Sequence, residues 1–381
     1  MPPLLSRRSF AISAPLVLLA AACPKRDADE IRVGAYLSLS GPDATFGSDT
    51  REGIALAVDE AVAAGGIRGR RIRLLYEDDK SSAQEATQKV QQLIDRDGVV
   101  ALLGEAASSR SLAGGLIANT RRVPMITPSS TAVEVTKDRE WVFRTCFTDD
   151  QQGEAAARYV RGPLAKSKAA ILYAAQDTYS SGLARAFRES FVRLGGAVAI
   201  DKGYPKGETN FRTYLAEVRA ARPEIVFVPN YYSEMVLIAR HARELGIAGT
   251  MFFGGDGWDS TVLLEGAAQE LEGALFTNHY APDVPWPSAK KFLAAFRAKY
   301  AHDPAGGSAQ GYDAASLLFD AMRRARDLTA AAIRAAIAET KEFPGATGTT
   351  TMGPERNPKK PIVVVQIRDR AFRYASEITT T

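Results

Sequence analysis

The sequence predicts an α/β protein of two domains, each built on a doubly wound and mostly parallel sheet. The chain has 381 residues, of which 46% are hydrophobic and 24% charged, a composition typical of globular proteins and a length that allows two cores. From residue 31 onward, apolar runs typical of strands alternate with segments whose apolar residues recur at helical spacing. The alternation pauses after residue 127 and restarts at residue 168, which indicates two successive units.

The first unit contains four predicted strands and three predicted helices. The strand at 31–41 is mostly apolar and ends at a Gly-Pro turn, and the helix at 47–66 ends at a Gly-Gly pair. The alternation continues with strands at 70–79, 99–104 and 123–127 and with helices at 82–98 and 108–122. This strand–helix order favours a parallel sheet with helices on both faces.

The second unit repeats the pattern. Strands are expected at 168–174, 197–205, 224–230 and 250–257, and helices at 179–196, 210–222 and 233–246. A helix-rich stretch follows from Pro287 to Glu339. Residues 359–374 are predicted to form two strands joined by a turn.

The first 23 residues have the pattern of an export signal. Arg7 and Arg8 precede an apolar run from Ala11 to Ala22, which is short for a membrane span. Cys23 directly follows the small residues, as in a bacterial lipoprotein signal. We therefore expect residues 1–22 to be a signal peptide and Cys23 to be acylated, with plain secretion as the alternative. The SRRSF motif leaves twin-arginine and ordinary export open.

The remaining chemistry of the chain argues against an enzyme. If Cys23 is acylated, Cys146 has no partner for a disulfide, and it is expected to be a buried structural thiol. The basic residues of the chain are interleaved with acidic ones, and the net charge is +4. This distribution does not suggest a nucleic-acid surface. No Gly-rich nucleotide motif, G-x-S-x-G motif or close His/Cys metal spacing is present, so we expect no catalysis, cofactor or metal.

Polar and aromatic residues gather just after several predicted strands. Ligands of open parallel sheets bind at this edge. Hydroxyls and helix-start amides suit a carboxylate, an acid suits an ammonium, and aromatic rings suit an apolar wall. The residues concerned are Ser108, Ser109, Ser129, Ser130, Thr131, Tyr231, Tyr232, Asp256 and Trp258.

Each of these residues also has a purely structural explanation. Ser108 or Ser109 can begin a helix, and the tyrosines can belong to the core. Asp256 can be a turn residue, and Thr131 with Glu134 fits a capping box that starts a short helix. Their joint placement at strand ends in both units is what favours a ligand site.

Several segments together resemble the leucine/isoleucine/valine-binding protein family, the substrate-binding subunits of branched-chain amino acid ABC transporters. They include LSLSGPDATFG, LLGEAASS, VPMITPSSTA, FRTCFTDDQQG and NYYSEMVLIARHARELG, and the resemblance runs from Ile31 to about Tyr374. It implies a type I periplasmic-binding-protein fold, with two lobes joined by three crossovers that close on a ligand. The expected division is 23–148 plus 281–345 for lobe 1 and 149–280 plus 346–381 for lobe 2.

The resemblance also implies ligand-binding positions. The family's carboxylate-binding serine corresponds to Ser108, which is followed by Ser109, and its ammonium-binding glutamate corresponds to Asp256, one methylene shorter. The other implied positions are Ser129, Ser130 and Thr131 for the stretch after the proline, Phe46 for the first-loop aromatic residue, and Tyr179 and Tyr231 for the second-lobe tyrosines.

The chain departs from the family pattern near the ligand's side chain. Ala106 stands in place of a bulkier apolar residue, and a large aromatic residue is missing around Gly306 and Gly307. Trp258 is a candidate to refill that space. Ser81 and Ala107 stand at the positions of a first-lobe disulfide. The amino-acid head group therefore looks retained, whereas the side-chain preference is open.

The resemblance implies a periplasmic, lipid-anchored binding protein that passes an amino acid, branched-chain or otherwise apolar, to permease subunits. Its expected partners are a small-molecule ligand, the permease and the membrane, and no nucleic acid. Two alternatives remain open: a ligand-sensing protein that works with a separate chain, and a binding protein for aromatic or other small carboxylates. Both use the same fold.

Overall fold

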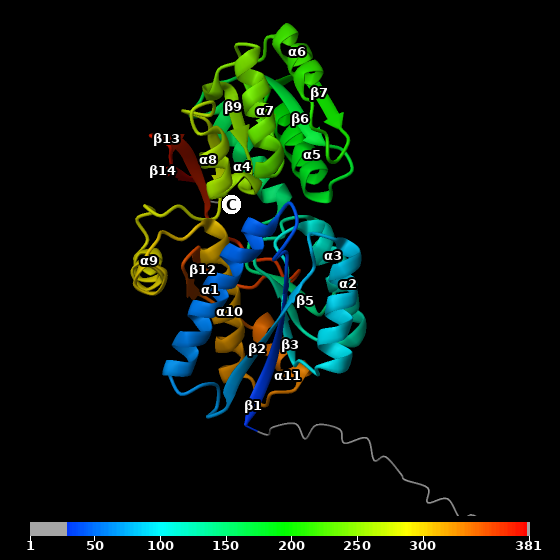
Figure 1. Cartoon of the computed structure of the whole chain (residues 1–381), viewed down its shortest axis with the longest axis vertical. Coiled ribbons are helices and arrows are strands. Elements are labelled where there is room, and N and C mark those ends of the chain that lie inside the picture. The colour runs from blue at the N-terminus through cyan, green and yellow to red at the C-terminus, as the bar shows by residue number, and fades with distance from the viewer. Residues whose placement is uncertain (1–28, 379–381) are drawn as a thin grey trace, which may run out of the picture.

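The computed structural model describes residues 29–378, which form two α/β lobes placed end to end (Figure 1). Lobe 1 contains a five-stranded sheet of order β2-β1-β3-β4-β5, in which every neighbouring pair is parallel. Its strands are β1 (Glu30–Leu37), β2 (Arg71–Asp78), β3 (Ala101–Leu103), β4 (Met125–Thr127) and β5 (Val142–Arg144). The expected α/β class is confirmed.

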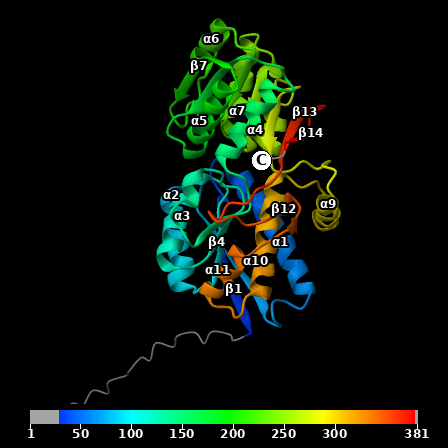
Figure 2. The ribbon, with the colours of Figure 1, turned by 180° about the vertical axis from the view of Figure 1, so that it is seen from behind.

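Helices cover both faces of the first sheet. Helices α1 (Ala44–Ala63) and α10 (Gly306–Arg324) lie side by side although they are far apart in the sequence (Figures 1 and 2). Their contact requires glycine, because a Cβ atom at Gly53 would collide with the Ser308 carbonyl oxygen. The other helices of this lobe are α2 (Ala83–Gln91), which continues as a π-helical turn (Gln92–Arg96), α3 (Ser108–Arg121) and α11 (Ala330–Ala338).

Lobe 2 contains a seven-stranded sheet of order β14-β13-β10-β9-β8-β6-β7. Its strands are β6 (Lys168–Ala174), β7 (Ala197–Tyr204), β8 (Ile225–Val228), β9 (Phe252–Gly254), β10 (Leu275–Asn278), β13 (Ile362–Arg368) and β14 (Ala371–Ile378). The pairs of β13 with β10 and with β14 are antiparallel, and the others are parallel. The helices are α4 (Asp149–Arg161), α5 (Thr178–Arg193), α6 (Arg212–Ala221), α7 (Tyr232–Glu244) and α8 (Thr261–Ala267).

Three segments connect the lobes, after β5, after β10 and before β13. The second leads to α9 (Pro287–Tyr300), and the third follows the hairpin of β11 (Phe343–Gly345) and β12 (Gly348–Thr350). The expected boundaries stay a prediction, and the contacts favour a third crossover later than residue 345. The Ala346 and Thr347 amides donate to Asp313 in α10, and Thr136 Oγ1 donates to Asn357.

The sequence analysis did not predict several elements of the fold. Strands β5 and β10 have three and four residues, and neither stood out as an apolar run. Helix α4 was also missed, although Thr148 and Gln151 form a capping box at its start. The helix-rich stretch and the C-terminal strand pair are confirmed as α9–α11 and β13–β14. None of the helices between residues 29 and 378 is long and apolar enough to cross a membrane.

Candidate ligand-binding site

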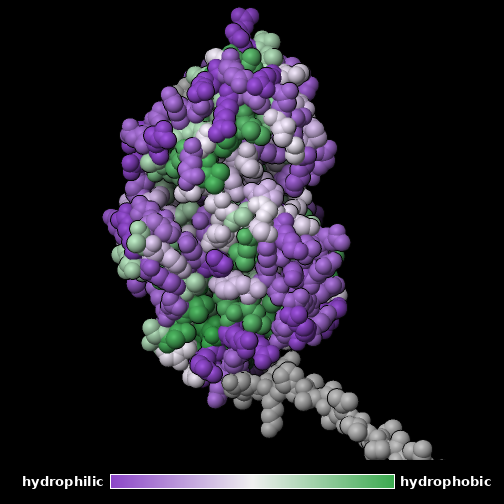
Figure 3. Space-filling model, in the orientation of Figure 1, coloured by the Kyte–Doolittle hydropathy of each residue, from purple (hydrophilic) through white to green (hydrophobic). Residues whose placement is uncertain are grey.

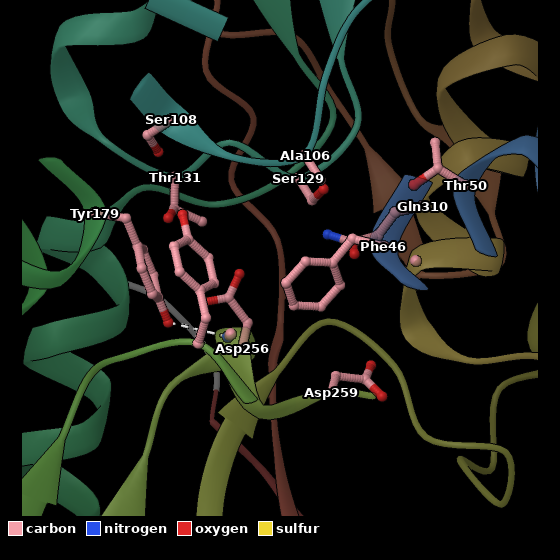
Figure 4. A pocket seen from close by; sticks show the side chains of 13 residues that line it. Phe46, Thr50, Ala106, Ser108, Ser129, Thr131, Tyr179, Asp256, Asp259 and Gln310 are labelled. Atoms are coloured by element: carbon pink, nitrogen blue, oxygen red, sulfur yellow. Dashed lines mark hydrogen bonds between the residues drawn. The ribbon is translucent and has the colours of Figure 1, made fainter. Parts of the chain in front are cut away.

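A cavity between the lobes contains most of the residues that the sequence singled out. About 440 Å³ of atom-free space, part of it open to solvent, lies within it. Its lining comes from both lobes (Figure 4): Phe46, Thr50, Ala106, Ser108, Ser129, Thr131, Tyr179, Tyr231, Asp256, Gly257, Asp259, Gly307 and Gln310. The structure thus brings together every expected ligand-binding residue except Ser109 and Ser130. Contact between any of these expected residues and a ligand stays a prediction.

The first-lobe wall presents hydroxyl groups next to a helix start. Helix α3 begins at Ser108, whose Oγ accepts a hydrogen bond of 3.2 Å from the Ala132 amide. Thr131 Oγ1 is buried without a protein hydrogen bond of normal geometry, although the Asp149 carboxyl lies near it. The expected capping box of Thr131 and Glu134 is wrong, because Ala132 is the N-cap of that turn and no side chain caps it. The Thr131 hydroxyl can therefore donate either to Asp149 or to a ligand.

A buried ion-pair cluster fixes the loops that carry this wall. The Arg110 guanidinium lies 2.9 Å from the Asp43 carboxylate and 3.0 Å from that of Glu105. Glu105 also accepts from the Ser38 amide and directly precedes the lining residue Ala106. Because Asp43 directly precedes α1, one arginine joins the start of the helix that carries Phe46 to the start of α3.

Asp256 lies opposite these hydroxyls, in a 3-10 turn after β9. Its Oδ1 accepts a hydrogen bond of 3.0 Å from Gln152 Nε2, and its Oδ2 lies 3.2 Å from His279 Nε2. Burial lowers the pKa of His279, so the neutral ring can donate to the carboxylate. Within residues 29–378, no lysine or arginine pairs with Asp256. Both oxygens of the Asp256 side chain thus have a neutral side-chain partner, and neither is paired with a lysine or arginine.

Sequence analysis missed both partners of Asp256. Gln152 belongs to α4 and His279 directly follows β10, and neither element was recognised. His279 also stacks on Phe147, with ring centroids 3.6 Å apart. The position of His279 directly after a strand is the sequence feature that could have identified it.

Three aromatic rings form an apolar wall. Tyr179 and Tyr231 stack at 5.2 Å between ring centroids, and Phe46 meets Tyr231 edge to face at 5.9 Å. The Tyr179 hydroxyl accepts from the Gly257 amide at 3.0 Å, which ties the ring to the turn that holds Asp256. Phe46 comes from lobe 1 and the tyrosines from lobe 2, so the wall is complete only when the lobes are together.

Three expected contributors lie elsewhere. Ser109 is partly exposed and lies outside the cavity lining. Ser130 is fully buried, with its Oγ 2.8 Å from the Ala106 carbonyl oxygen and 2.7 Å from Ser111 Oγ. Trp258 is fully buried in lobe 2, where its Nε1 donates to Asn230 at 2.9 Å, and it does not line the cavity. It therefore does not refill the space beside Ala106 and Gly307.

The cavity has two chemically different ends. We call Ser108, Ser129, Thr131, Tyr179 and Asp256 the head-group end, and Thr50, Asp259, Gly307 and Gln310 the distal end. In the close-up view, Ser108, Thr131, Tyr179 and Asp256 lie to the left of the Phe46 ring, Thr50 lies to its right and Asp259 lies below it (Figure 4). No sequence motif pointed to the distal end.

Cys146 takes no part in the cavity. It is fully buried, its Sγ lies 3.3 Å from the Ser130 carbonyl oxygen, and burial raises the pKa of its thiol to about 12. The expected buried structural thiol is confirmed. Among residues 29–378, no group of three or more His, Cys, Asp or Glu side chains is arranged to hold a metal ion. Cys23 and the expected signal peptide lie outside the described residues and stay a prediction.

The head-group end matches the charges of an α-amino acid. Hydroxyls and the start of α3 on lobe 1 can donate to a carboxylate, and Asp256 on lobe 2 can accept from an ammonium. On the face seen in Figure 3, residues of intermediate hydropathy and a few hydrophobic ones lie between the lobes, with hydrophilic residues on either side. A ligand held at both ends of its head group would join the lobes.

Comparisons with known proteins agree with this architecture. The family model described as periplasmic binding protein matches residues 30–371. The Leu/Ile/Val-binding protein BraC3 of Rhizobium johnstonii is 30% identical, over 90% of this chain and 92% of that protein. A leucine binding protein, LivK, from Thermotoga maritima is 33% identical, with a TM-score of 0.87 over 92% of this chain and 99% of that structure.

A structure with a bound amino acid is also similar. LivJ from Streptococcus pneumoniae, a branched-chain amino acid transporter substrate binding protein in complex with isoleucine, is 30% identical. Its TM-score is 0.86 over 92% of this chain and 99% of that structure. These matches span nearly all of the described residues and both lobes. The chain belongs to the periplasmic binding protein family, a family of binding proteins with two lobes around one ligand site.

Proposed function

We propose that the protein captures an α-amino acid between its lobes and delivers it to the permease of an ABC transporter. The observation that carries the proposal is the placement of Asp256 on lobe 2 opposite Ser108 and Thr131 on lobe 1, with the cavity between them. Similarity to amino-acid-binding proteins of this transporter class supports it.

Closure of the lobes is the step that ligand binding drives. Contacts between lobes already form beside the cavity: the Tyr232 hydroxyl donates to the Pro42 carbonyl at 2.9 Å, and the Gly306 amide donates to Asp259 at 2.9 Å. A ligand that contacts both lobes binds the closed form more tightly than the open form and shifts the population toward it. The permease would then recognise the closed lobes.

Calorimetry with matched ligands tests the amino-acid assignment. We expect α-amino acids to bind at least about tenfold more tightly than their des-amino analogues, because removing the ammonium leaves the Asp256 carboxylate unpaired. The Asp256→Asn variant should lose most of this discrimination. Equal binding of the des-amino acids, or binding of benzoate-like acids alone, would contradict the proposal and favour a carboxylate-binding protein.

The proposed location is the periplasmic face of the membrane, with Cys23 as the lipid anchor. The apolar run that ends at Cys23 supports this. Cys23→Ala should release the protein into the soluble fraction or block its processing, and mass spectrometry of the mature N-terminus checks it. An unmodified N-terminus elsewhere would exclude the anchor and leave the ligand proposal intact. Copurification with a sensor kinase instead of a permease would favour a sensing role.

A further inference from the structure

The distal end of the cavity is more polar than an aliphatic side chain requires. Small residues, Ala106 and Gly307, line this part of the cavity, which also reaches Thr50 and Gln310 of lobe 1 and Asp259 of lobe 2. A pocket for a branched aliphatic group is expected to be lined by apolar side chains. The polar groups at this end therefore need an explanation.

Asp259 offers an acceptor from lobe 2. Its Oδ2 accepts hydrogen bonds from Asn278 Nδ2 at 2.7 Å and from the Gly306 amide at 2.9 Å. Among residues 29–378, no hydrogen bond reaches its Oδ1, and no lysine or arginine pairs with it. Burial raises the pKa of Asp259 to about 6, so at pH 7.5 the carboxylate is mostly ionised. One of its oxygens is left for a group inside the cavity.

Asp49 adds a second acid from lobe 1, directly behind Gly307. A Cβ atom at Gly307 would lie 3.2 Å from Asp49 Cβ. Asp49 as a residue is partly exposed, but its Oδ2 is buried and has no hydrogen-bond partner. Burial and the nearby Asp259 raise its pKa to about 8. The two acids come from different lobes, and the ionised Asp259 favours the protonated form of Asp49.

Thr50 is a second, independent indication that a hydrogen-bond partner is missing at this end. It is fully buried, it lines the cavity, and its Oγ1 has no hydrogen-bond partner. The Gln310 amide, also in the lining, makes a single long contact of 3.5 Å with the Pro128 carbonyl oxygen. A buried polar group without a partner is unfavourable. A ligand that donates hydrogen bonds would complete these groups.

We propose that the distal end binds a ligand side chain that ends in a hydrogen-bond-donating nitrogen, such as an ammonium, guanidinium or amide, instead of an aliphatic group. The proposal rests on the proposed function, since it assumes an α-amino acid at the head-group end. A donor placed between Asp259 and the α1–α10 pair would also join the two lobes.

Isothermal titration calorimetry of the mature protein at pH 7.5 tests this with matched ligand pairs. Lysine is compared with norleucine, and glutamine with glutamate, which has the same shape but does not donate. Arginine and citrulline separate a cationic donor from a neutral one. We expect at least one donor ligand of this set to bind about tenfold or more tighter than leucine and norleucine.

Substitutions at the distal end then test which residues cause the preference for donor ligands. Asp259→Asn and Thr50→Val should each reduce the ratio of donor to aliphatic affinity by about fivefold or more. Asp59→Asn is the control, because Asp59 lies on the same helix as Thr50 but is exposed and pairs with Lys299. Thermal melts check that each variant is folded, and the comparison of ligands on the unaltered protein needs no variant.

The outcomes separate the two proposals. Leucine or norleucine binding at least as tightly as every donor ligand would overturn the distal assignment and leave the amino-acid function standing, with water filling the polar end. If the preference for donor ligands persists in both Asp259→Asn and Thr50→Val, the distal assignment is also overturned. If no α-amino acid binds at all, the proposed function itself is wrong.

Discussion

The two ends of the cavity differ in how far the protein itself satisfies their polar groups. At the head-group end, Asp256 is held by Gln152 and His279, and Ser108 Oγ accepts from a backbone amide. At the distal end, both protein donors to Asp259 reach its Oδ2, and none reaches its Oδ1. Each end also has one buried threonine hydroxyl without a partner, Thr131 at the first and Thr50 at the second. We therefore expect head-group variants to change affinity for all ligands and distal variants to change selectivity.

The largest expected effect comes from the carboxylate donors. Hydrogen bonds to a charged group contribute roughly 1.5–3 kcal/mol each. Ser108→Ala and Thr131→Ala should therefore each weaken binding by about tenfold or more, and equally for every amino acid. Calorimetry with a short and a long amino acid measures both points. Unchanged affinity in both variants would rule out a side-chain role for these hydroxyls.

The preorganisation of Asp256 can be broken with one substitution. Gln152→Leu removes the donor to Asp256 Oδ1 at similar size, so we expect affinity to fall by about five- to tenfold. The loss should be the same for aliphatic and for donor side chains. If it depends on the side chain, Gln152 acts on the distal end and the comparison of the two ends fails.

The raised pKa of Asp49, behind the distal end, should make the stability of the folded protein depend on pH. Because the pKa of Asp49 is raised from its ordinary value of 3.8 to about 8, the folded protein holds this proton more tightly than the unfolded chain does. Its stabilising contribution is full below pH 4 and is lost as the pH rises through about 8. An asparagine at this position does not ionise, so the Asp49→Asn variant should gain stability over the natural protein as the pH rises.

Thermal melts without ligand measure this difference. We expect the advantage of Asp49→Asn to be larger at pH 8.5 than at pH 5 by about 2–4 °C, which corresponds to on the order of 1 kcal/mol. The groups that face Asp49 are Asp259 and Glu52. A constant difference across this range would show that Asp49 titrates normally.

The smallest expected effect is a control for the first prediction. Ser109 neighbours Ser108 in the sequence but lies outside the cavity lining. Ser109→Ala should therefore change ligand affinity by less than about twofold, as is usual for a substitution away from a site. A tenfold loss would mean that the two serines exchange roles when a ligand is bound.

Sequence patterns predicted the long elements and the head-group end because both depend on local signals. Apolar runs mark β1 and β8, and hydroxyls after strand ends mark Ser108 and Thr131. The short strands β5 and β10 depend on pairing with their neighbours, so local propensity does not reveal them.

The distal end left no local signal in the sequence. Thr50 and Gln310 lie on two helices that are far apart in the chain, and Asp259 follows a short turn. They meet only because α1 packs on α10 and the lobes come together. Only the absence of bulk at Ala106 and Gly307 indicated that this end differs from the family pattern.

The pairing of α1 with α10 also constrains how the chain can fold. Lobe 1 obtains α1 near the start of the chain and α10 near its end, and both belong to the same hydrophobic core. Contacts so distant in sequence close late and slowly. Between β6 and β10, by contrast, lobe 2 is one continuous stretch of five parallel strands and their helices. Lobe 1 is therefore expected to finish folding only after the ribosome has released α10, whereas the five parallel strands of lobe 2 can pair before that; β13 and β14 join their sheet later.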